Sequence, residues 1–71
     1  MSKLQLLQEK IKQAFDKSTG ENAPKRIEFS ILLEFEMAFL VMAGLINHND
    51  MDKVMAIEEK LWNAGLVGGL T

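Results

Sequence analysis

The sequence predicts a small all-α domain in which an N-terminal helix precedes a helical hairpin. Its 71 residues are enough for one domain only. Hydrophobic residues make up 48% of the chain and charged residues 25%, which is typical of a folded globular protein. Apolar residues also recur with helical spacing in the first and third segments. We therefore expect a single helical domain over residues 1–71, with helices at about 2–18, 25–47 and 50–64 and a flexible tail at 66–71.

The first helix has a recognisable start. Ser2 followed by Gln5 matches the S-x-x-Q capping box, in which each side chain accepts a hydrogen bond from a backbone N–H that has no partner in the helix. Gly20 suits the end of this helix, and Pro24 suits the first turn of the next one. One face of the helix is apolar and is formed by Leu4, Leu7, Ile11 and Ala14.

The second segment supports two interpretations. Apolar residues occupy every odd position from Ile27 to Phe39, which is the period of a β-strand. However, Leu, Glu, Met and Ala dominate residues 32–43, and these are good helix formers. We expect a helix here. The alternative is a short strand at residues 26–32 that leads into a shorter helix.

The third helix follows the polar turn at residues 47–50. Several residues of this turn are suitable N-caps, and Asp50 and Asp52 place negative charge at the positive end of the helix dipole. Gly65 is the expected stop. The apolar face of this helix consists of Met51, Val54, Met55, Ile57, Leu61 and Trp62.

The second helix predicts self-association, because residues 29–46 carry apolar side chains on nearly every side and two flanking helices cannot cover them all. Packing this segment against a symmetry mate would bury the excess, so we expect a homodimer or a higher homo-oligomer. The alternative is that the other helices and the tail cover the segment within one chain. The candidate residues for the oligomer interface or for partner binding are Phe29, Leu33, Phe35, Phe39, Met42, Met55, Glu58, Leu61 and Trp62.

Two polar residues of the third segment, Glu58 and His48, are of types that can take part in chemistry. Glu58 lies in the middle of an apolar helical face, where a carboxylate must find a partner or reach water. It is a candidate for an ion pair across an interface or for an acid that lines a pocket. The alternative is that this helix lies on the surface and Glu58 is solvated at its edge. His48 lies in a polar turn near Asp50 and Asp52, where it could bind a divalent metal or act as a base. Because no second His at helical spacing and no Cys accompany it, we expect a solvated turn residue and no metal site.

The composition argues against several classes of function. The chain has no Cys, one His and no nucleophile motif or phosphate-binding loop, so we expect no enzyme, no cofactor and no metal. A net charge of −2 argues against a nucleic-acid partner. Uncharged apolar stretches are too short to span a membrane, so we expect a cytoplasmic protein.

These observations favour a small acidic protein-interaction module that acts as a homo-oligomer through an apolar helical surface. Its partners would be itself and an unidentified protein, and its role that of an inhibitor, an assembly factor or a regulatory subunit. The alternative is a small dimeric DNA-binding regulator that resembles ribbon-helix-helix repressors in outline, with residues 26–32 as the paired strand.

Overall fold

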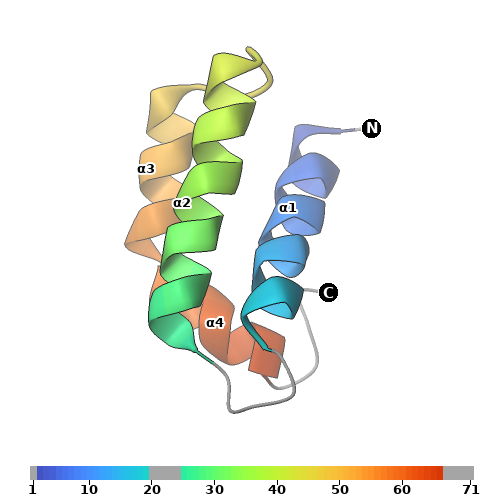
Figure 1. The fold of residues 1–71 in the computed structure, drawn as a ribbon. Helices are drawn as coiled ribbons and strands as arrows, with labels where there is room; N and C mark the ends of the chain where they lie inside the picture. The colour runs from blue at the N-terminus through green and yellow to red at the C-terminus, as the bar shows by residue number, and fades with distance from the viewer. Residues whose placement is uncertain (1, 20–24, 67–71) are drawn as a thin grey trace.

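A helical bundle is built around one central helix. The computed structural model describes residues 2–19 and 25–66. The described residues form four helices, α1 (Lys3–Ser18), α2 (Arg26–Met42), α3 (His48–Ala56) and α4 (Glu58–Leu66). Figure 1 shows α2 between α1 and α3, with the chain direction alternating over these three helices, and α4 closing the lower end. The all-α prediction is confirmed.

The capping box predicted at the start of α1 is present. The Ser2 hydroxyl accepts a hydrogen bond from the Gln5 N–H at 3.2 Å, and the Gln5 side chain accepts one from the Ser2 N–H at 3.0 Å. Gly20 and Pro24, which were expected to separate the first two helices, lie outside the described residues, as do residues 67–71 of the expected tail.

The second segment is a helix, as predicted, and the alternative of a short strand at residues 26–32 is wrong. The buried residues of α2 recur at intervals of three and four, which places them on one side of a helix; they are Phe29, Leu33, Met37 and Leu40. The helix ends at Met42 rather than near residue 47, because Gly44 adopts a left-handed conformation with a φ of 75°. The Leu45 N–H then donates to the Leu40 carbonyl at 2.9 Å, which closes the helix end.

The helix expected at residues 50–64 is divided in two. Asn47 caps α3: its side-chain oxygen accepts from the Asp50 N–H at 2.8 Å, and the Asp50 carboxylate accepts from the Asn47 N–H at 3.3 Å. The regular hydrogen-bond pattern breaks at Ile57, whose N–H donates to the Val54 carbonyl at 3.2 Å. The following helix, α4, continues through Gly65 to Leu66, so Gly65 does not end it as expected.

The core lies between α2 and the three other helices. Its lower end is an aromatic cluster in which the Phe15 and Trp62 ring centroids are 4.9 Å apart and the Phe29 and Trp62 centroids 5.1 Å apart. Trp62 reaches this cluster because the break at Ile57 turns α4 beneath the bundle (Figure 1). The buried apolar residues are Ile11, Ala14, Phe29, Leu33, Met37, Leu40, Ile46, Val54 and Trp62.

Candidate interaction surface

The side of α2 that faces away from the core carries large apolar side chains that remain exposed. We call this surface the outer face of α2. Four of its residues follow one another at intervals of four along the helix, and the fifth lies near their C-terminal end. The exposed fractions are 80% for Ile27, 49% for Ile31, 67% for Phe35, 59% for Phe39 and 86% for Met42.

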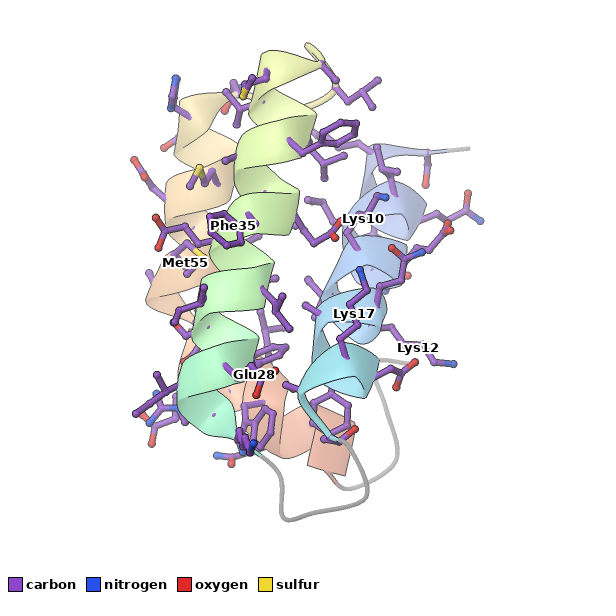
Figure 2. The ribbon with its side chains drawn as sticks, in the orientation of Figure 1. Lys10, Lys12, Lys17, Glu28, Phe35 and Met55 are labelled. Carbon is purple, nitrogen blue, oxygen red and sulfur yellow. The ribbon has the colours of Figure 1, made fainter. Side chains whose placement is uncertain are left out.

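Charged side chains of α1 line one edge of the outer face, and an apolar residue of α3 lies near the other. In Figure 2, Phe35 lies on the side of α2 nearest Met55 of α3, whereas Lys10 and Lys17 of α1 line the other side. Both lysines approach Glu36 of α2, with Nζ to carboxylate distances of 3.5 Å and 3.8 Å. The Lys10 Nζ also lies 5.8 Å from the centre of the Phe39 ring, a cation–π distance. The charges on the α1 edge of the outer face are therefore paired within the chain.

A depression with a volume of about 640 Å³ opens beside the N-terminal half of the outer face. Its wall is almost entirely apolar, although charged residues stand at its rim. The described residues that line it are Lys25, Arg26, Ile27, Glu28, Ile31 and Leu32. Glu28, which Figure 2 shows near the lower end of α2, lies 4.0 Å from the Lys25 Nζ. The outer face thus has a recess at one end of the helix.

The structure divides the predicted interface residues between the surface and the core. Phe35, Phe39 and Met42 lie together on the outer face, and Met55 and Leu61 are half-buried. The remaining four are buried within the chain and are Phe29, Leu33, Glu58 and Trp62.

The sequence prediction did not include Ile27 and Ile31, which extend the outer face toward the start of α2. Their signal was present in the sequence, since they precede Phe35 by eight and four residues.

Glu58 finds its partner within the chain. The Arg26 Nε donates to both carboxylate oxygens of Glu58 at 3.2 Å. Glu58 is only 8% exposed, whereas the Arg26 side chain is half-exposed. This pair ties the first turn of α2 to the first turn of α4. Glu58 therefore needs no second copy to balance its charge.

Two further titratable side chains, Asp50 and His48, lie at the start of α3. The hydrogen bond from the Asn47 backbone N–H and that from the Lys3 ammonium, at 3.1 Å, hold the pKa of Asp50 below its ordinary value of 3.8. His48 is exposed in the first turn of α3. No group of three or more His, Asp or Glu side chains that could hold a metal ion occurs within residues 2–19 and 25–66.

The chain was compared with known protein families, curated proteins and solved structures. No protein-family model, curated protein or solved structure matches this chain. Across the part of the chain that the structure describes, every helix is too short or too polar to cross a membrane.

Proposed function

We propose that this chain is a non-enzymatic protein-interaction module that acts through the outer face of α2 as a homo-oligomer. The observation that carries the proposal is the row of five exposed apolar side chains on one side of one helix. A single exposed apolar residue is ordinary on a protein surface, whereas a contiguous row of them is typical of a binding surface.

The size of the row supports an interface. Large apolar side chains have areas of about 150–250 Å² each, so the exposed fractions correspond to roughly 500–850 Å² of apolar surface. The largest apolar patch on a monomeric protein is about 300–600 Å² and is itself often functional. A specific protein interface buries about 800 Å² on each partner. The outer face is therefore close to the size that one partner contributes.

The core of the chain does not depend on this row. The buried row of α2, formed by Phe29, Leu33, Met37 and Leu40, lies on the opposite side of the helix and packs against the other helices. The outer row is thus available to cover a surface of another protein. This suits an inhibitor, an assembly factor or a regulatory subunit, each of which works by such contact. The DNA-binding alternative required a strand where α2 begins, and residues 26–32 are helical.

Sedimentation equilibrium of the purified full chain tests the proposal. The wild type is expected to be dimeric or larger at micromolar concentration, and Phe35→Ser is expected to shift it toward the monomer. Phe35 is 67% exposed, so this variant should keep its helical circular dichroism. The control is Leu4→Ser, which replaces a residue of similar exposure, 64%, on α1. A wild-type chain that stays monomeric up to millimolar concentration would remove the proposal.

A further inference from the structure

The two halves of the outer face differ in shape. Ile27 and Ile31 lie beside the depression at the start of α2, whereas Phe39 and Met42 project from the C-terminal half. Leu32, which lines the depression, is seven residues before Phe39, so the two residues lie along the same edge of the helix. The depression, which forms a recess, and Phe39, which forms a projection, therefore lie along one edge of α2. The recess is on the N-terminal side of Phe35 and the projection on its C-terminal side.

A two-fold axis determines which of these features meet when two copies pack face to face. An axis perpendicular to α2 at the level of Phe35 reverses the helix direction but keeps each edge on its own side. Because Ile31 and Phe39 are each four residues from Phe35, Phe39 of one copy then comes to the level of Ile31 in the other, on the edge that holds the depression. An axis parallel to α2 would keep the level of each residue but exchange the two edges, so that the depression of one copy would face the opposite edge of the other and Phe39 would not reach it.

The spacing of the row favours the same contact. Ile27, Ile31, Phe35 and Phe39 form a ridge of residues at intervals of four. Interdigitation of two such ridges is the commonest way in which helices pack in globular proteins, with a crossing angle of about 50° in magnitude. The ridges of the two copies can then run side by side in opposite directions, with the two Phe35 rings adjacent near the axis.

Area and charge are compatible with a second copy. The exposed outer face, together with the wall of the depression, approaches the roughly 800 Å² per partner of a standard interface. The five residues of the outer face are uncharged, and the exposed Glu28, which lines the depression on the same side of α2, lies 4.0 Å from the Lys25 Nζ of its own chain. The net charge of −2 per chain gives little repulsion between copies. Antiparallel packing also brings opposite ends of the two helix dipoles together.

We infer that the outer face of α2 is covered by the same face of a second copy in antiparallel orientation, so that Phe39 of each chain enters the depression at residues 25–32 of the other. This pairing rests on the proposed function and assigns a definite orientation to it. The chain contributes the same projection and the same recess twice, so the interface closes with two copies and leaves neither feature unpaired.

Disulfide cross-linking tests the orientation, because the chain has no Cys of its own. Ile31→Cys and Phe39→Cys chains, one of them lengthened by a tag, are mixed in equal amounts at a concentration where the wild type is a dimer and are then oxidised. We expect the mixed cross-link to predominate over either same-position cross-link. A second pair, Ile27→Cys with Met42→Cys, keeps Phe39 in place and should give the same pattern. Circular dichroism of each reduced variant confirms that it is folded.

The outcomes separate the pairing from the proposed function. Predominant same-position cross-links, or a wild-type dimer that yields no cross-link with either pair, would overturn the antiparallel arrangement while leaving self-association intact. A wild-type chain that sediments as a monomer would overturn the proposed function and the pairing together.

Discussion

The ion pair between Arg26 and Glu58 gives a quantitative test of how the first turns of α2 and α4 are held together. Replacing Arg26 by Met leaves a carboxylate that is only 8% exposed without its partner. Breaking a fully buried pair costs about 3–5 kcal/mol, and losing an exposed pair costs about 1 kcal/mol or less. Because the Arg26 side chain is half-exposed, we expect a loss of about 2 kcal/mol.

A loss of this size is large for so small a chain, since 71 residues at typical per-residue values give about 4–10 kcal/mol of total stability. The assay is urea unfolding followed by far-UV circular dichroism and by Trp62 fluorescence. All variants carry Phe35→Ser so that self-association does not contribute. The double variant Arg26→Met/Glu58→Leu should recover most of the loss, because apolar side chains then replace both charges.

The matched control is Lys25→Met, which removes the neighbouring cation from an exposed pair with a Lys25 to Glu28 distance of 4.0 Å. This change should cost less than about 0.5 kcal/mol. The buried-pair reasoning is refuted if Arg26→Met is no more destabilising than Lys25→Met. It is also refuted if Arg26→Met/Glu58→Leu has a lower free energy of unfolding than Arg26→Met and Glu58→Leu each have alone.

Three further predictions concern the helix ends. Since the folded-state pKa of Asp50 is lowered from 3.8, its carboxylate stabilises the fold above that pH, and the contribution is lost as the pH falls below it. Asp50→Asn should therefore have a lower melting temperature than the wild type near neutral pH. Paired thermal melts in which this difference in melting temperature persists at acid pH would contradict the assignment. Asn47→Ala should cost about 1 kcal/mol in urea unfolding through loss of the α3 cap, whereas Asn49→Ala, which removes no capping bond, should not. Gly44→Ala should cost about 1 kcal/mol because of its φ of 75°, although a Cβ there meets no atom within 4 Å; an unchanged urea midpoint would show that this turn tolerates a side chain.

Local signals were the part of the fold that the sequence predicted well. The Ser2 and Gln5 capping box depends on residues three positions apart and is present. For the third segment the sequence left several N-caps open within residues 47–50, and Asn47 is the one that caps α3. The break at Ile57 was not predicted, because neither Gly nor Pro marks it. It brings Glu58 to Arg26 and Trp62 to the aromatic cluster, and these contacts join residues far apart in the chain.

The candidate surface was predicted in part for a related reason. Phe29, Leu33 and Phe35 look alike in the sequence, and which of them faces the core depends on where α1 and α3 pack. Ile46 illustrates the same limit: it was expected to continue the second helix, but the turn at Gly44 directs it back into the core, where it is 7% exposed.

The strand-like alternation in the second segment has a simple origin once the segment is known to be a helix. Residues two positions apart on a helix differ by about 200°, so apolar residues at every odd position form two rows on opposite sides. One row is buried and contains Phe29, Leu33 and Met37, and the other is exposed and contains Ile27, Ile31, Phe35 and Phe39. Polar residues in the exposed row would leave the buried row unchanged. Both proposals rest on this row of exposed apolar side chains, and both would account for it by a surface that covers it.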